Sequence, residues 1–134
     1  MKILREISTD KPLSSPDKVY KYLNEFKDQD REMFIVIGLD TRNIPCYREI
    51  VSIGTLNNTV VHPREVFKKA VMLSCNSIIL AHNHPSGDPE PSEEDKTTTH
   101  QLVEAGKILG IQVLDHVILG RERNYSFNDN GELK

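Results

Sequence analysis

The sequence has no tryptophan, only two cysteines and no long run of hydrophobic residues. Its longest apolar stretch, residues 34–39, has the length of a strand, whereas a membrane-spanning helix needs about 20 residues. The amino terminus lacks the apolar segment of a secretory signal, and Cys46 and Cys75 form no C-x-x-C pair. These absences argue against a transmembrane segment and a disulfide scaffold. We expect a cytoplasmic protein with two reduced thiols.

A basic excess is also missing. The 17 lysines and arginines are outnumbered by 20 aspartates and glutamates, which gives a net charge of -3. A duplex-binding domain normally carries a clear positive excess, because neutralising phosphates supplies most of its affinity. The overall charge therefore does not favour nucleic acid as a partner, although the charge balance leaves room for a local basic patch.

What is present is the composition of one globular domain: 134 residues, 37% of them hydrophobic and 28% charged. Hydrophobic periodicity predicts three helices, which begin at Ser15-Pro16-Asp17, near His62 and near Ser92, the last one ending at Gly110. Apolar runs predict strands at 33–39, 45–53, 78–81, 111–119 and 125–127, with turns at 40–43 and 130–131 and a loop at 55–59. Because strands alternate with helices, we expect one α/β domain over residues 1–134, with a mixed β-sheet flanked by helices and a loosely ordered lead-in at 1–14.

The most informative segment runs from His82 to Asp95. His82 and His84 are separated by one residue at the end of a predicted strand, so their side chains project to the same side. Ten residues lie between His84 and Asp95, and the proline- and glycine-rich loop among them returns the start of the next helix to the strand end. Imidazole and carboxylate are suitable zinc ligands, and three of them leave a fourth position for water. The pattern predicts one zinc ion per chain, held by His82, His84 and Asp95, which lowers the pKa of water to about 7.

Simpler interpretations explain parts of this segment. Two nearby histidines are often polar loop residues, and Ser92 with Asp95 resembles a shortened capping box that needs no metal. The metal is favoured by the conjunction of two histidines directly after a buried strand with a serine and an aspartate that open the next helix. Ser92 is able to serve both purposes.

Taken together, these residues resemble the RadC family, a bacterial branch of the JAMM (MPN+, JAB1-type) metalloprotease superfamily. The superfamily pattern is an upstream glutamate, then H-x-H, seven residues, serine, two residues and aspartate. His82, His84, Ser92 and Asp95 fit this pattern without a gap. The surrounding sequence resembles the RadC branch at residues 54–56, 62–66, 82–88 and 114–116.

The resemblance implies the JAB1/MPN fold, a mixed sheet flanked by helices that is similar in layout to the cytidine deaminases. The zinc deaminase patterns H-x-E and P-C-x-x-C are absent, which argues against base deamination. Full-length RadC proteins usually carry an additional helical amino-terminal domain. We therefore expect this chain to be the catalytic domain alone, either excised or as a short stand-alone form.

The resemblance also implies two catalytic residues. Glu32, in the matching context E-x-F, would be the general acid/base that takes a proton from the attacking water and passes it to the leaving amine. Ser92 would donate a hydrogen bond to the developing oxyanion. The residues alone do not single out Glu32, and proximity to the histidines would favour Glu90 or Glu93.

The remaining polar candidates have weaker signals. His116 could orient a metal ligand, but we favour a histidine whose hydrogen bonds are merely satisfied in a buried strand. His62 and Arg64 are expected to cap and solvate their helix, and Asp88 to serve a turn. His100 lies on the predicted exposed face of its helix, so no role is assigned to it.

These expectations favour a zinc-dependent hydrolase, a metallopeptidase or isopeptidase acting on a peptide or protein substrate, with no membrane partner. Zinc-activated water attacks several electrophiles, so a non-peptide substrate also stays open. The alternative from another class is a DNA-repair-associated binding module with a structural or vestigial zinc site, motivated by the historical link of the family to repair.

Overall fold

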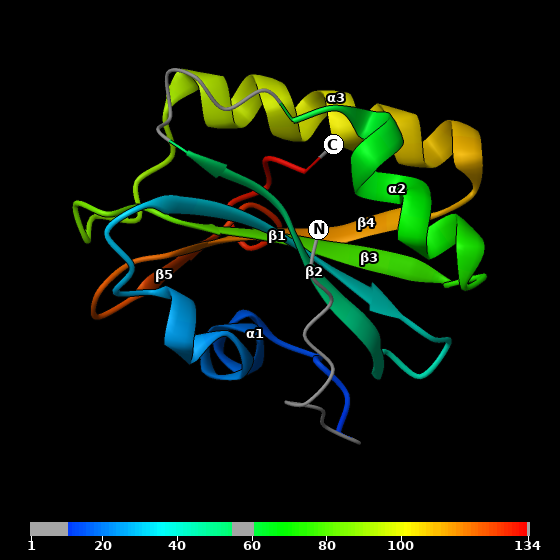
Figure 1. The fold of residues 1–134 in the computed structure, drawn as a ribbon, viewed down its shortest axis with the longest axis horizontal. Coiled ribbons are helices and arrows are strands. Elements are labelled where there is room, and N and C mark those ends of the chain that lie inside the picture. Colours follow the sequence, from blue (N-terminus) through cyan, green and yellow to red (C-terminus); the bar gives the residue numbers. More distant parts are fainter. Residues whose placement is uncertain (1–10, 55–60, 134) are drawn as a thin grey trace.

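The fold is a five-stranded mixed sheet with helices on both faces, as Figure 1 shows for the computed structural model. The structure describes residues 11–54 and 61–133. The strand order is β2-β1-β3-β4-β5, and within this sheet only β3 and β4 pair in parallel. The strands are β1 (Glu32–Leu39), β2 (Pro45–Gly54), β3 (Ser77–Asn83), β4 (Gln112–Leu119) and β5 (Asn124–Ser126). The predicted α/β class with a mixed sheet is confirmed.

The helices divide between the two faces of the sheet. In Figure 1, α2 and α3 lie above the sheet and α1 lies below it. Each face therefore has its own apolar layer, one under α2 and α3 and one under α1. The helices are α1 (Pro16–Tyr22), followed by the short 3-10 helix η1 (Asn24–Phe26), α2 (Pro63–Met72) and α3 (Glu93–Leu109).

The central strands explain why the sheet needs both layers. Every residue of β3 is buried, and seven of the eight residues of β1 are buried. A strand with one exposed face alternates apolar and polar residues, whereas a strand with both faces covered has a continuous apolar sequence. This is the pattern that residues 34–39 show.

The helix ends follow the local sequence signals, with one exception. Ser15 Oγ accepts a hydrogen bond from the Lys18 N–H at 3.3 Å, and α3 ends at Gly110, whose φ of 74° lies in the left-handed region that suits glycine. His62 occupies the N-cap position of α2 but makes no side-chain capping bond, so the expectation that it caps this helix is wrong. Pro63 at the first helical position supplies the preset backbone instead.

Some predicted boundaries need correction. β3 continues two residues beyond the predicted end at Ala81, because His82 still pairs with β1 and both His82 and Asn83 pair with β4. The end of the supposed lead-in is packed, since Leu13 is buried and its N–H donates to Asn43 O. Residues 1–10 of the lead-in and the loop at 55–59 lie outside the described residues. Within the described ranges, no helix is long and apolar enough to cross a membrane.

Candidate metal centre

The end of β3 carries the two histidines. His82 is the sixth residue of β3, and His84 directly follows the strand. Because side chains alternate along a strand, the two imidazoles project to the same face, the one that α3 covers. Both side chains are buried.

Pairing between β1 and β3 brings in a glutamate from 50 residues earlier. Phe34 lies opposite His82 in the antiparallel ladder, and Glu32, two residues before Phe34, shares its face of the sheet. Glu32 is only 5% exposed. The predicted upstream glutamate therefore lies beside the histidines, whereas Glu90 and Glu93, which proximity alone would favour, are exposed and lie outside the cluster.

The start of α3 supplies the aspartate. The Asp95 N–H donates to Ser92 Oγ at 3.0 Å, and the Ser92 N–H donates to Asp95 Oδ2 at 2.9 Å, which is a reciprocal capping box. This box fixes the orientation of the Asp95 carboxylate, and the same carboxylate faces both histidines. The two interpretations of the segment are thus compatible, since the aspartate that closes the helix end also lies in the cluster.

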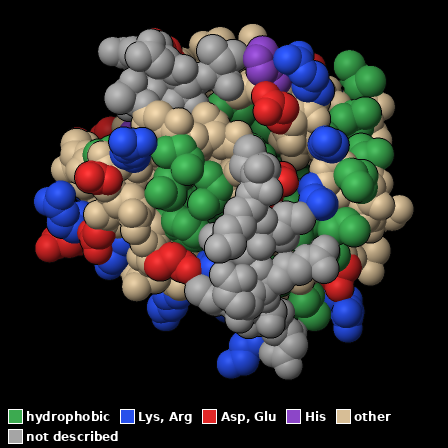
Figure 2. All heavy atoms as spheres, in the orientation of Figure 1, with side chains coloured by type: hydrophobic (Ala, Val, Ile, Leu, Met, Phe, Trp, Pro, Cys, Tyr) green, Lys and Arg blue, Asp and Glu red, His purple; other side chains and the backbone are tan. Residues whose placement is uncertain are grey.

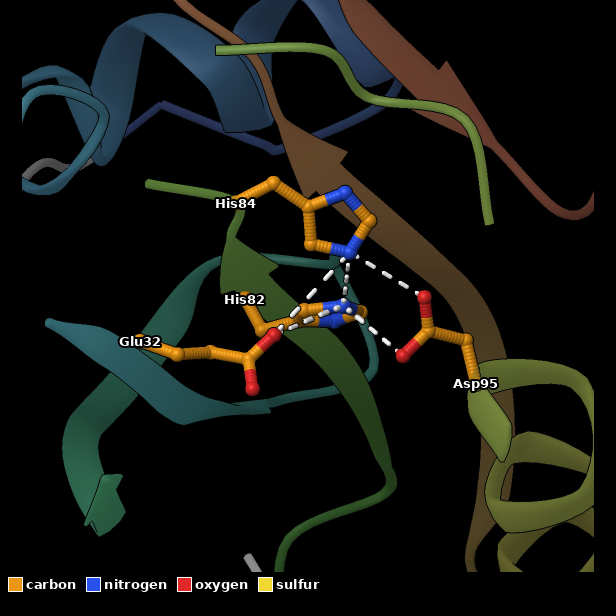
Figure 3. Close-up of side chains that lie close together, drawn as sticks. All are labelled: Glu32, His82, His84 and Asp95. Atoms are coloured by element: carbon orange, nitrogen blue, oxygen red, sulfur yellow. Dashed lines mark hydrogen bonds and ion pairs between the residues drawn. The ribbon is translucent and has the colours of Figure 1, made fainter. Parts of the chain in front are cut away.

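Figure 3 shows Glu32, His82, His84 and Asp95 pointing toward a common centre. One ligand atom from each of the four lies within 4.8 Å of the others. The Nε2 atoms of His82 and His84 are 3.0 Å apart. They lie 3.2 Å and 3.1 Å from Asp95 Oδ1 and Oδ2, respectively.

These separations fit a tetrahedral ion. Nitrogen and oxygen ligands that each lie about 2.0–2.2 Å from zinc are about 3.3 Å from one another. The two imidazole nitrogens match that spacing, and each has one carboxylate oxygen of Asp95 at a similar distance, Oδ1 for His82 and Oδ2 for His84. Glu32 Oε1 is farther away, at 3.7 Å from His82 Nε2 and 3.9 Å from His84 Nε2. Glu32 Oε1 is also buried with no hydrogen-bond partner among the described residues. The donor set fits a cation held by three ligands, with a carboxylate close to it.

The protonation pattern also suits a cation. Burial raises the pKa of Asp95, but its contacts with His82 and His84 outweigh burial and hold that pKa well below its usual range. Burial lowers the pKa of His82 more than its contact with Asp95 raises it. Burial also lowers the pKa of His84, but its contacts with Asp95 and Asp88 outweigh burial and raise that pKa overall. At neutral pH, Asp95 is therefore an ionised carboxylate and His82 a neutral imidazole, the forms in which these two side chains bind metals.

Glu32 has an unusual pKa. Burial and, after it, the nearby charge of Asp95 raise the pKa of Glu32 to about 7, while His84 opposes the shift. A carboxyl group that titrates near neutrality can both accept and release a proton under ordinary conditions. A cation at the centre would favour the ionised form of the same group.

The other ring nitrogen of each histidine has a protein partner. His84 Nδ1 donates to the backbone oxygen of Asp88 at 2.8 Å, because a carbonyl can only accept. His82 Nδ1 lies 2.7 Å from Nε2 of His116, a fully buried residue of β4. Our favoured interpretation of His116, a histidine without a role in the site, is thus incomplete, since its hydrogen bond goes to His82. Asp88 joins the site through its backbone and not through its side chain.

Asn83, between the two histidines, positions the segment that carries Glu32. Its side chain points to the opposite face, where Oδ1 accepts from the Met33 N–H at 2.7 Å and Nδ2 donates to Arg31 O at 2.9 Å. These bonds hold the backbone on both sides of Glu32. The one local signal of this role is an amide side chain at a strand position that alternates with two histidines.

A recess opens beside the centre. Its volume of about 30 Å³ is enough for a water molecule. Glu32, His82, Asp95 and His116 form its polar wall, and Phe34, Val61, Glu94 and Thr98 complete the lining. Ser92 is half-buried at the capping box, where its Oγ accepts one hydrogen bond; no described residue accepts its hydroxyl proton, so it remains able to donate. His100 is exposed and lies away from the recess.

Residues 13–132 match the family of RadC-like JAB domains. The UPF0758 protein of Methanosarcina mazei is 52% identical over 123 residues, which are 91% of this chain and 54% of the relative. The UPF0758 protein of Methanosarcina barkeri is 51% identical over 121 residues, 90% of this chain and 53% of the relative. The UPF0758 protein of Caldanaerobacter subterraneus subsp. tengcongensis is 52% identical over 120 residues, which are 89% of this chain and 52% of the relative. The chain thus spans about half the length of the curated relatives it matches.

Proposed function

Because the chain belongs to the family of RadC-like JAB domains, we propose that it is a zinc-dependent hydrolase that cleaves an amide or isopeptide bond in a peptide or protein. The observation that carries the proposal is the convergence of His82, His84 and Asp95: the two Nε2 atoms are 3.0 Å apart, and each lies 3.1–3.2 Å from one oxygen of the Asp95 carboxylate, a spacing that suits the ligands of one tetrahedral ion. His and carboxylate ligands without thiolates are typical of catalytic zinc sites, which keep a position open.

In this proposal the chain contributes a binding site, a proton carrier and a hydrogen-bond donor. Bound zinc supplies a Lewis acid that lowers the pKa of water from 15.7 to about 7 and polarises a carbonyl group. Glu32 Oε1, which has no hydrogen-bond partner among the described residues, accepts the proton of the attacking water. As the C–N bond breaks, Glu32 returns this proton to the leaving amine.

Ser92 would stabilise the negative charge that builds up on the carbonyl oxygen. Its Oγ is already oriented by the hydrogen bond from the Asp95 N–H, and its own proton is available for donation. A donor held in place before the reaction costs no reorganisation when charge develops. Removing one such donor typically lowers kcat by about 10²–10³-fold.

We propose a peptide or protein substrate in preference to nucleic acid. The net charge of the chain is -3, and acidic and basic side chains intermingle on the face shown in Figure 2. Titration with single-stranded and branched DNA at physiological salt tests this choice. Tight binding that is unchanged by Asp95→Ala would favour a nucleic-acid-binding module instead.

The activity is tested by comparing new protein termini in cells that express the wild-type chain, Glu32→Gln or Glu90→Gln. Glu90 is exposed and outside the cluster, so Glu90→Gln is the matched control. The proposal predicts termini that appear with the wild type and the control and disappear with Glu32→Gln. Equal termini in all three would contradict it.

A further inference from the structure

A chain of polar side chains runs through the apolar layer behind the metal centre. Thr99 Oγ1 lies 2.7 Å from the backbone oxygen of Asp95 and 2.5 Å from His116 Nδ1. His116 Nε2 lies 2.7 Å from His82 Nδ1. The residues His82, Thr99 and His116 are at most 2% exposed, so water does not complete these contacts.

The direction of the hydrogen bonds follows from counting protons. A threonine hydroxyl has one proton, and a backbone oxygen has none, so the contact with Asp95 O requires Thr99 to donate. Thr99 Oγ1 must then accept from its other neighbour, and His116 carries its proton on Nδ1.

The remaining bonds are fixed by the same count. A buried imidazole without a charged partner is neutral and has one N–H, which His116 already uses toward Thr99. His116 Nε2 therefore accepts, and His82 Nδ1 donates to it. His82 Nδ1 is thus protonated, and in its neutral form His82 has no proton left for Nε2, the atom that faces Asp95 and His84.

Aromatic rings keep His116 in the orientation that this direction needs. Its ring stacks on Phe127 with centroids 4.9 Å apart and an interplanar angle of 14°, and Phe34 packs edge-on at 5.5 Å. A 180° flip of the ring would replace both nitrogens with carbons and break the contacts with Thr99 and His82. The series of hydrogen bonds also starts and ends at the metal centre. Asp95 contributes its carboxylate to the centre, and its backbone carbonyl accepts the hydrogen bond from Thr99.

We propose that Thr99 and His116 are positioning residues that hold His82 as the tautomer protonated at Nδ1, with an unprotonated Nε2 available as a metal ligand. The effect of this tautomer on zinc affinity rests on the proposed function, whereas the tautomer itself is a property of the metal-free protein. The matched variants are Thr99→Val, which keeps the shape and removes the acceptor, and Thr99→Ser, which keeps the hydroxyl.

The first measurement is ¹⁵N NMR of the imidazole nitrogens in metal-free wild-type protein, which distinguishes protonated from unprotonated ring nitrogens. Both His82 and His116 are expected to carry their proton on Nδ1. A proton on Nε2 of either ring would overturn the proposal. This measurement needs no variant to fold and no metal to bind.

The second measurement is zinc affinity by competition with a chromophoric chelator, for folded protein as judged by thermal denaturation. Loss of such hydrogen bonds typically weakens metal binding about 10–100-fold, so we expect that loss in Thr99→Val and wild-type affinity in Thr99→Ser. Equal affinity in Thr99→Val and the wild type would overturn the positioning role but leave the proposed metal centre intact. A wild-type protein that binds no zinc yet shows the expected tautomers would contradict the proposed function. It would still support the proposed direction of the hydrogen bonds among Thr99, His116 and His82.

Discussion

The charge of Glu32 should destabilise the metal-free protein at high pH, and Glu32→Gln should remove this effect. Burial and the neighbouring Asp95 raise the pKa of Glu32 from 4.5 to about 7. A carboxyl whose pKa is higher in the folded state binds its proton more tightly there. The free energy of unfolding therefore falls as the pH rises from about 4.5 to about 7 and is level above that range.

The size of the effect follows from this pKa. A rise from 4.5 to about 7 corresponds to about 3 kcal/mol at most, and partial screening by water at the open recess reduces this to about 1–2 kcal/mol. Glu32→Gln should be more stable than the wild type by that amount at pH 8 and nearly equal to it at pH 4.5. Denaturant titrations with a chelator present, at several pH values, measure the difference.

Glu90→Gln serves as the control, because Glu90 is exposed and lies outside the cluster. Zinc should reduce the advantage of Glu32→Gln, since a cation offsets the charge of Glu32. Parallel pH curves for the wild type and Glu32→Gln would refute the assigned environment of this carboxyl.

Three further changes test the scaffold, each by denaturant titration. Asn83→Leu leaves the backbone groups on either side of Glu32 without their side-chain partner and should cost about 1–3 kcal/mol, whereas a smaller loss would mean that solvent replaces these bonds. Arg48→Met removes a guanidinium that is 1% exposed, pairs with a carboxylate at 2.7 Å and lies over two aromatic rings. We expect the free energy of unfolding to fall by about 1–3 kcal/mol. An unchanged stability would show that the ion pair only offsets its desolvation. Gly38→Ala would place a methyl group 2.0 Å from the Tyr47 ring, so we expect a loss of about 1–3 kcal/mol, and a neutral change would contradict the close packing of this ring.

The sequence was most informative where the signals are local. His82, His84 and Asp95 could be grouped because strand alternation and a short stiff loop determine how these side chains meet. The capping signal at Ser92 and the stop at Gly110 likewise depend on a few neighbouring residues, and both are confirmed. The family resemblance is confirmed by the match over residues 13–132.

Contacts between distant segments were not predictable in the same way. Glu32 reaches the histidines only because β1 pairs with β3 in one particular antiparallel register. Nothing in the sequence around Glu32 specifies that register, so only the resemblance singled it out, and local proximity favoured the exposed Glu90 and Glu93. Its role in proton transfer stays a prediction.

His116 shows the same limit from the other side of the centre. Its apolar neighbours correctly indicate a buried strand, but the parallel pairing of β4 with β3 determines that its buried partner is His82. Thr99 gave no signal at all, because a threonine within a helix usually needs no tertiary partner. Sequence patterns identify the ligands of such a site more readily than the groups that orient them.

Zinc titration of the metal-free protein by calorimetry tests the central claim most directly. The account predicts one tightly bound zinc ion per wild-type chain, the same stoichiometry and affinity for His100→Ala, whose histidine is exposed, and loss of tight binding for His82→Ala. Undiminished zinc binding by His82→Ala, or no binding by the folded wild-type chain, would contradict it.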